Sequence, residues 1–170
     1  MIALFVRYLD LVLMRLPPQA FPASRFLFGV TLLAFAIVML VSNFILSGDW
    51  VYSLVRAVLS VFNLCAGAAL ILVIAKRSAR WQQTATALLG GETVIALIVL
   101  PVLLARTMGM ENVFLLMSLL LFLAWELVFL AHVYRNALGT GMGTGLLIAV
   151  IYVISSVYIK QLVMPFPVPP

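Results

Sequence analysis

Long runs of apolar residues with few charges between them constrain this chain more than any other feature. Of its 170 residues, 66% are hydrophobic and only 9% are charged, a balance far outside that of soluble globular proteins. A helix that crosses a hydrocarbon core of about 30 Å needs about 20 apolar residues, so the chain has room for about five such helices. The sequence therefore predicts an all-α, polytopic protein that forms a single membrane domain over residues 1–170.

Turn residues and charges divide the apolar sequence into separate predicted helices. A Ser-Gly-Asp turn at 47–49 and a basic cluster at 76–80 are two of the breaks, and Gly139 begins a third. The predicted membrane spans cover residues 26–46, 51–75, 83–105, 112–133 and 141–159. The tail, residues 160–170, is predicted to lie outside the membrane, and residues 164–170 are too rich in proline to be helical.

The N-terminal segment has a different pattern. At about 100° per residue, Arg7, Asp10 and Arg15 fall on one side of a helix and apolar residues cover the rest, so residues 1–16 are predicted to form an amphipathic helix in the membrane interface. Residues 17–25 contain three prolines and cannot continue that helix. They are predicted to form a stiff linker, with Ser24 as the N-cap of the first span.

Basic residues gather on one side of the predicted bundle. Because cytoplasmic loops of membrane proteins are enriched in lysine and arginine, the N-terminus is predicted to be cytoplasmic and the C-terminus exterior, across a cell inner membrane. The formal charge of +5 is then a topology signal, and no nucleic-acid partner is predicted. The residues on the predicted cytoplasmic side are Arg7, Arg15, Arg25, Lys76, Arg77, Arg80 and Arg135.

Four polar residues inside the predicted spans form the candidate site. An ionisable group within a bilayer costs several kcal/mol unless it is paired or hydrated, which makes Arg56, Glu92 and Glu126 informative positions. Asn63 is predicted at about the same depth as Glu126. It shares one helix stripe with Ser53, Arg56, Ser60 and Gly67, and that stripe is predicted to face protein. Arg56 is predicted to be held by Glu92, which lies nearer to it in depth than Glu126.

Three interpretations of this polar cluster are open. The cluster can be structural, with Arg56 paired to a glutamate and Asn63 hydrogen-bonded to another helix. It can be a proton- or ion-handling pair, since a carboxyl group within a membrane can take up and release a proton. It can also recognise another membrane subunit. A metal or cofactor site is not predicted, because the chain has a single histidine and a single cysteine.

The layout resembles that of small bacterial membrane proteins of the Yip1-like type. The shared features are a short cytoplasmic lead, a proline-containing approach at 17–24 and five closely spaced helices with an exterior C-terminus. The long acidic N-terminal region and the Tyr-Gly-Pro type signature of the eukaryotic members are missing, so their trafficking partners are not carried over. The resemblance implies a non-enzymatic membrane organiser and transfers no functional residue.

These observations favour a non-enzymatic accessory or scaffolding subunit of a larger inner-membrane assembly. Its predicted partners are the lipid bilayer and either other integral membrane subunits or further copies of the chain, which it would contact helix to helix. The alternative is a small ion- or proton-coupled transporter or channel component that uses Glu92 and Glu126.

Overall fold

The structure, a computed structural model, describes residues 2–110 and 112–165. Its five long helices are α2 (Arg25–Ser47), α3 (Trp50–Ile74), α4 (Trp81–Thr107), α5 (Val113–Leu138) and α6 (Met142–Val163). The shortest has 22 residues, which at about 1.5 Å per residue is enough to cross a hydrocarbon core. All five are apolar enough to span a membrane, so the prediction of an all-helical protein is confirmed, and these five helices are candidates for the five predicted spans.

The helix ends follow from local sequence. Ser24 accepts a hydrogen bond from the backbone N–H of Leu27, as expected of an N-cap. Asp49 caps α3 and Asn112 caps α5 in the same way. Gly139 ends α5 in a left-handed conformation, with φ of 68°, which costs a glycine little. These short polar connections turn the apolar helices back on themselves.

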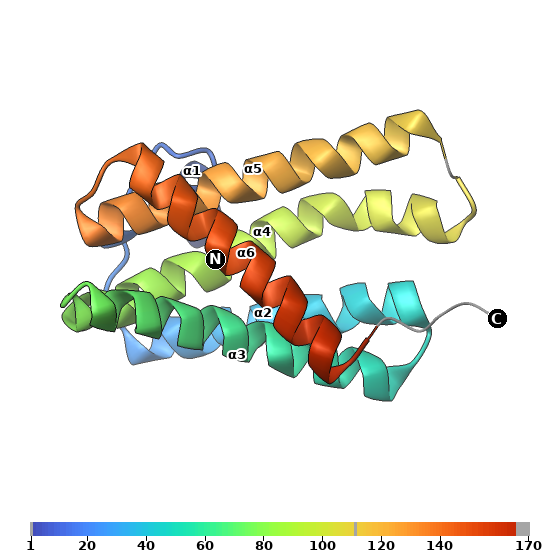
Figure 1. The fold of residues 1–170 in the computed structure, drawn as a ribbon, viewed down its shortest axis with the longest axis horizontal. Helices are drawn as coiled ribbons and strands as arrows, with labels where there is room; N and C mark the ends of the chain where they lie inside the picture. Colours follow the sequence, from blue (N-terminus) through green and yellow to red (C-terminus); the bar gives the residue numbers. More distant parts are fainter. Residues whose placement is uncertain (1, 111, 166–170) are drawn as a thin grey trace.

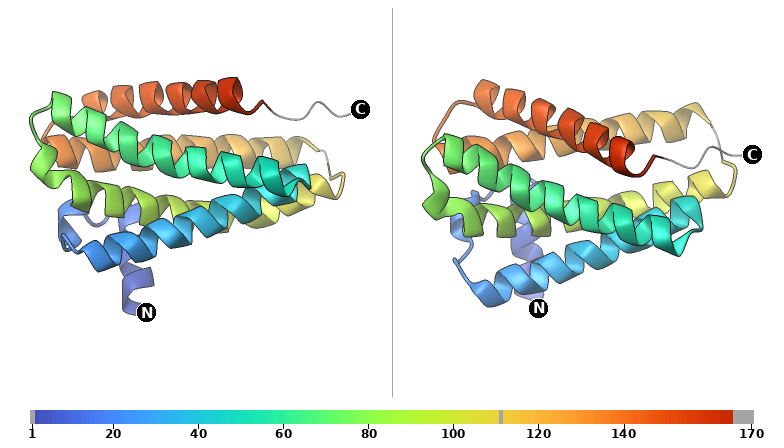
Figure 2. Two further views of the ribbon diagram at one scale, coloured as in Figure 1. Left: turned by 90° about the horizontal axis from the view of Figure 1, so that it is seen from below. Right: turned by 60° about the horizontal axis from the view of Figure 1, so that its bottom comes forward.

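The long helices run side by side, with α4 at the centre of the bundle (Figures 1 and 2). Helix α4 contacts α1, α2, α3 and α5, whereas α6 packs along α5 and reaches α3. We call the end that holds residues 75–80 and Gly139 the basic end. The opposite end, which holds residues 48–49, residues 108–110 and the C-terminus of α6, is the far end.

The outer surface of the bundle is apolar along its length. Phe26 near the basic end is 81% exposed and Phe114 near the far end is 80% exposed, and large aliphatic side chains lie between them on every long helix. A water-soluble protein rarely exposes such continuous apolar area, whereas lipid solvates it. Five apolar helices with this surface indicate a multi-pass membrane protein.

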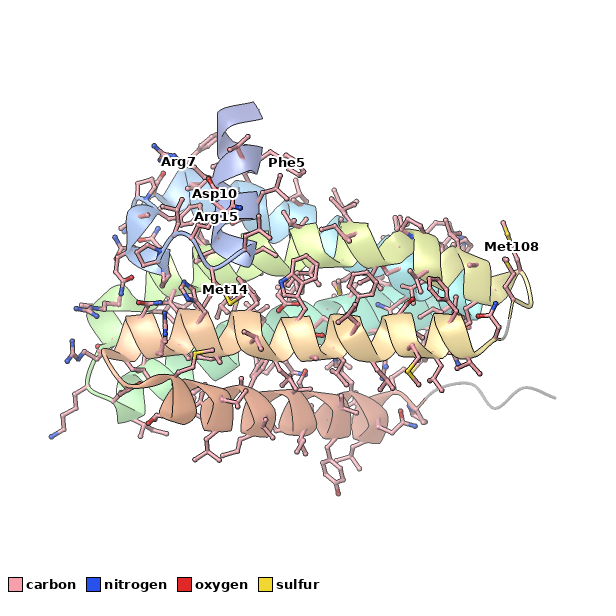
Figure 3. The ribbon with its side chains drawn as sticks, turned by 90° about the horizontal axis from the view of Figure 1, so that it is seen from above. Phe5, Arg7, Asp10, Met14, Arg15 and Met108 are labelled. Carbon is pink, nitrogen blue, oxygen red and sulfur yellow. The ribbon has the colours of Figure 1, made fainter. Side chains whose placement is uncertain are left out.

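The predicted amphipathic helix over residues 1–16 is not confirmed. Helix α1 (Ile2–Val12) has only 11 residues and is followed by a turn in which Met14 is left-handed, with φ of 60°. A short 3₁₀ helix, η1 (Pro18–Ala20), follows, because prolines in the linker prevent α-helix continuation. Helix α1 runs across the long helices near the basic end rather than alongside them (Figures 2 and 3).

One side of α1 is buried against the bundle. Tyr8, Leu11 and Val12 are at most 5% exposed, and the ring of Tyr8 stacks on Phe21 with centroids 4.6 Å apart. Any Cβ on Gly90 would collide with the Tyr8 ring, so α4 must have a glycine there. This burial also raises the pKa of the Tyr8 hydroxyl above its usual range. The N-terminal segment is therefore a packed part of the fold.

Hydrogen bonds between α5 and residues 12–19 hold the N-terminal segment in place. Trp125 Nε1 donates to the carbonyl of Val12 at 3.2 Å, and His132 Nε2 donates to the carbonyl of Leu16 at 3.0 Å. Gln19 in turn donates to the carbonyl of Asn136 at 2.6 Å. These contacts explain why α5 continues to Leu138, beyond its predicted end at residue 133: its last turns bind protein instead of lipid.

The half of the bundle near the basic end is closely packed. Every residue from 84 to 91 of α4 and from 129 to 134 of α5 is buried. Gly91 lies against the ring of Phe129, and Gly145 of α6 lies against the backbone carbonyl of Ala131. The first half of α5 contributes few buried residues, so the helices pack less closely toward the far end.

Candidate functional site

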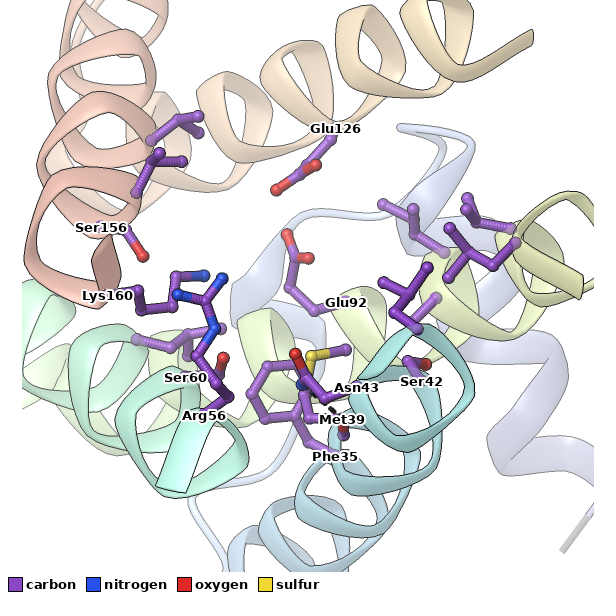
Figure 4. Close-up of a pocket in the computed structure, with 18 of the residues that line it drawn as sticks. Phe35, Met39, Ser42, Asn43, Arg56, Ser60, Glu92, Glu126, Ser156 and Lys160 are labelled. Carbon is purple, nitrogen blue, oxygen red and sulfur yellow. Dashed lines mark hydrogen bonds between the residues drawn. The ribbon is translucent and has the colours of Figure 1, made fainter. Parts of the chain in front are cut away.

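A cavity of about 410 Å³ lies in the half of the bundle near the far end, among all five long helices. This volume falls within the range of small-molecule sites in proteins. Its apolar walls include Phe35, Met39 and Val99. Its polar lining, part of which is drawn in Figure 4, consists of Ser42, Asn43, Arg56, Ser60, Glu92, Glu126, Tyr152, Ser156 and Lys160.

Two cations form one wall of the cavity. Arg56 of α3 is 8% exposed, and its Nη1 donates to the carbonyl of Met164 at 3.1 Å, just past the end of α6. Its guanidinium carbon lies 5.5 Å from the centroid of the Tyr52 ring, within cation–π range. The ammonium group of Lys160, from α6, lies beside the guanidinium (Figure 4). Two positive charges thus approach the same space from different helices.

Two carboxyl groups form the opposite wall. Glu92 of α4 and Glu126 of α5 point toward one another (Figure 4). Oε1 of Glu92 is buried and has no hydrogen-bond partner among the residues that the structure describes. Lys160 forms no ion pair within 4.0 Å with either glutamate, and all three residues belong to the described part of the chain.

Hydroxyl and amide groups lie between these walls. Ser60 lies on α3 one turn after Arg56, and Ser156 on α6 one turn before Lys160. Asn43 of α2 uses its amide N–H to donate to the carbonyl of Met39 at 2.7 Å, which leaves its amide oxygen available. Neutral polar groups can therefore complete the hydrogen bonds of a molecule held by the charged walls.

Aromatic rings form the floor of the cavity on the side of the basic end. Tyr152 lines the cavity and packs against Tyr134, whose ring centroid is 6.3 Å away. Tyr134 is fully buried among the closely packed residues described above. The cavity therefore ends at this floor.

Three of the four predicted site residues share this cavity. Arg56, Glu92 and Glu126 line it, whereas Asn63 is buried but is not part of the lining. The predicted pairing of Arg56 with Glu92 stays a prediction; Arg56 contacts Met164 and Tyr52. The polar stripe on α3 does face protein, because Ser53, Arg56, Ser60 and Asn63 are all at most 8% exposed.

Lys160 is a charged site residue that was not predicted from the sequence, which placed it in the exterior tail. It lies instead in the last turn of α6 and lines the cavity. A signal was present, because small and polar residues recur every three or four positions on one side of this helix. These residues are Gly145, Ala149, Tyr152, Ser156 and Lys160.

The lining limits the chemistry of this cavity. No group of three or more histidine, cysteine, aspartate or glutamate side chains within residues 2–110 and 112–165 could hold a metal ion. What the cavity offers is two carboxyl groups, two cations and several hydroxyl groups. This set can bind charged groups of either sign and can exchange protons at the carboxyl groups.

Comparison with family models, with curated proteins and with solved structures finds no match to this chain. The resemblance to Yip1-like proteins therefore stays a prediction.

Proposed function

We propose that this protein is a non-enzymatic carrier component of a cell inner membrane that moves protons together with a small polar solute. The observation that carries the proposal is the cavity near the far end, into which Arg56, Lys160, Glu92 and Glu126 all direct their charges. Charged groups within a membrane are costly and usually mark ion or substrate pathways.

The cavity favours the transport alternative over the scaffolding function expected first. A scaffold recognises its partners through its outer surface and has no need of charged groups directed into its own interior. The polar groups point inward, toward a space large enough for a ligand. With the cytoplasmic N-terminus that we propose from the basic residues, the far end faces the exterior and the cavity lies in the outer half of the membrane.

Proton entry into liposomes tests this proposal. In vesicles that contain the purified protein and a trapped pH-sensitive dye, with small polar solutes such as amino acids outside, an imposed potassium diffusion potential should drive proton uptake faster than in empty vesicles. Glu92→Gln or Glu126→Gln should abolish the difference, because an amide cannot exchange a proton at neutral pH. Asp10→Asn makes the same chemical change on α1, outside the cavity, and should leave uptake unchanged.

A scaffold would give the opposite pattern. Wild-type vesicles would then take up protons no faster than empty ones, and purification in a mild detergent would recover a partner subunit in a fixed ratio. That pair of results would remove the carrier proposal and restore the accessory-subunit interpretation.

Reporter fusions test the proposed orientation. Because five spans place the two ends of the chain on opposite sides, a reporter joined after Arg80 should report the cytoplasm and one joined after Pro170 the exterior. A cytoplasmic signal at Pro170 would contradict the orientation or the number of spans that cross the membrane.

Cysteine labelling tests the proposal that α1 lies in the cytoplasmic interface. Arg7 projects toward the basic end, whereas Phe5 projects toward the far end (Figure 3). In a Cys65→Ser background, cysteine at Arg7 or Arg15 should react with a water-soluble maleimide from the cytoplasmic side, and cysteine at Phe5 should react much more slowly. If cysteines at positions 7 and 15 react as slowly as cysteine at position 5, α1 does not lie in the cytoplasmic interface.

A further inference from the structure

We propose that the cavity binds a zwitterion, with an ammonium group between Glu92 and Glu126 and an anionic group, carboxylate or phosphate, against Arg56 and Lys160. The inference rests on the proposed function, because it names the solute that the same cavity would take. It follows from how charges of each sign are distributed over the lining.

The charges of the cavity are separated by sign. Arg56 and Lys160 lie beside one another on the wall made by α3 and α6, and Glu92 and Glu126 point toward one another from α4 and α5 (Figure 4). Like charges repel strongly where the dielectric constant is low. If these residues only formed ion pairs within the protein, residues of opposite charge would be expected beside one another. Separated pairs instead match a ligand that carries both signs at its two ends.

The space between the walls supports the same conclusion. The ammonium group of Lys160 forms no ion pair within 4.0 Å with Glu92 or Glu126, all of them described residues. Oε1 of Glu92 is buried without a hydrogen-bond partner among the described residues. An ammonium group near Glu92 would supply both the missing donor and a charge between the two walls.

The separation of the two walls selects against singly charged ligands. A ligand with one charge would engage only one of the two walls, whereas a zwitterion can engage both at once. The guanidinium of Arg56 is held in place by Met164 and Tyr52, and a guanidinium group is well suited to attract a carboxylate or phosphate.

Two sources supply this chemistry, and the experiment separates them. A free zwitterion, such as an amino acid or ethanolamine phosphate, would enter as a solute, whereas phosphatidylethanolamine would present the same groups as a lipid headgroup. The full-length protein is placed in nanodiscs of phosphatidylglycerol alone or with phosphatidylethanolamine. Its thermal unfolding midpoint is then measured with glycine, ethanolamine phosphate, acetate or ethanolamine.

We expect glycine or ethanolamine phosphate to raise the midpoint in phosphatidylglycerol discs, while acetate and ethanolamine at equal concentration do not. If the source is a lipid, phosphatidylethanolamine should raise the midpoint instead. Lys160→Gln and Glu126→Gln should each weaken the effective zwitterion about tenfold or more, the equivalent of one lost charged contact. Arg106→Gln removes a cation from the same end without touching the cavity and should have no effect.

Two results would overturn the inference. One is that singly charged ions raise the midpoint as much as the zwitterions do, a comparison that needs only the wild-type protein. The other is that no zwitterion, free or lipid, has any effect. If the glutamine variants do not fold, Lys160→Arg and Glu126→Asp keep the charges and should retain binding. Proton uptake without zwitterion binding would overturn this inference alone, whereas binding without uptake would remove only the carrier function.

Discussion

Replacing Gly145 by alanine should destabilise the protein by about 1–3 kcal/mol, the usual cost of forcing extra volume into a packed interior. Its added Cβ would meet the backbone carbonyl of Ala131, which belongs to a buried turn of α5 and has no room to move. Helix α6 would have to shift away from α5. We expect a lower thermal unfolding midpoint in detergent and less protein in the membrane.

Gly143 provides a matched control two residues earlier on the same helix. A Cβ there would meet no other atom within 4 Å, so Gly143→Ala should be neutral or stabilise the helix by up to about 1 kcal/mol. Equal midpoints for Gly143→Ala and Gly145→Ala would show that the close approach of α5 and α6 is absent.

If a cation pairs with Glu92 in the membrane, replacing Glu92 by glutamine should be the most damaging single change to the charged cavity, with a cost of about 3–5 kcal/mol. It leaves two cations facing one carboxyl group. A guanidinium group cannot lose its charge, whereas a carboxyl group can take up a proton, so Arg56→Gln should be less harmful. The amount of membrane-inserted protein and its melting temperature in detergent measure both losses.

Double variants identify the cation that balances Glu92. If Arg56 is its partner, as the sequence predicts, Glu92→Gln together with Arg56→Gln should recover part of the loss. The same test with Lys160→Gln probes the other cation of the cavity. Losses that simply add in both double variants would mean that Glu92 interacts with neither cation.

Most of the fold was predictable from the sequence, because lipid imposes length and apolarity on each span. The caps Ser24, Asp49 and Asn112 lie at visible breaks in the apolar runs. The polar stripe of α3 also identified its protein-facing side correctly, since polar groups avoid lipid. Each of these features depends on the sequence of a single helix.

Features that depend on several helices together were not predictable. Lipid and protein interior are equally apolar, so hydrophobicity does not reveal which apolar faces meet or where they leave a cavity. Lys160 was predicted to lie in the exterior tail. Its depth in the bundle depends on where α6 ends relative to α3 and α4, which the sequence of α6 does not determine. Helix α1 likewise ends at Val12, just before a left-handed Met14 that the local sequence does not predict.

The anchoring of the N-terminal segment by α5 sets an order for synthesis. Val12 is bound by Trp125, Leu16 by His132 and Gln19 by Asn136, partners that lie between 113 and 117 residues further along the chain. Residues 12–19 can therefore make these hydrogen bonds only after α5, the fourth long helix, has been synthesised. A chain that stops before α5 would lack all three partners.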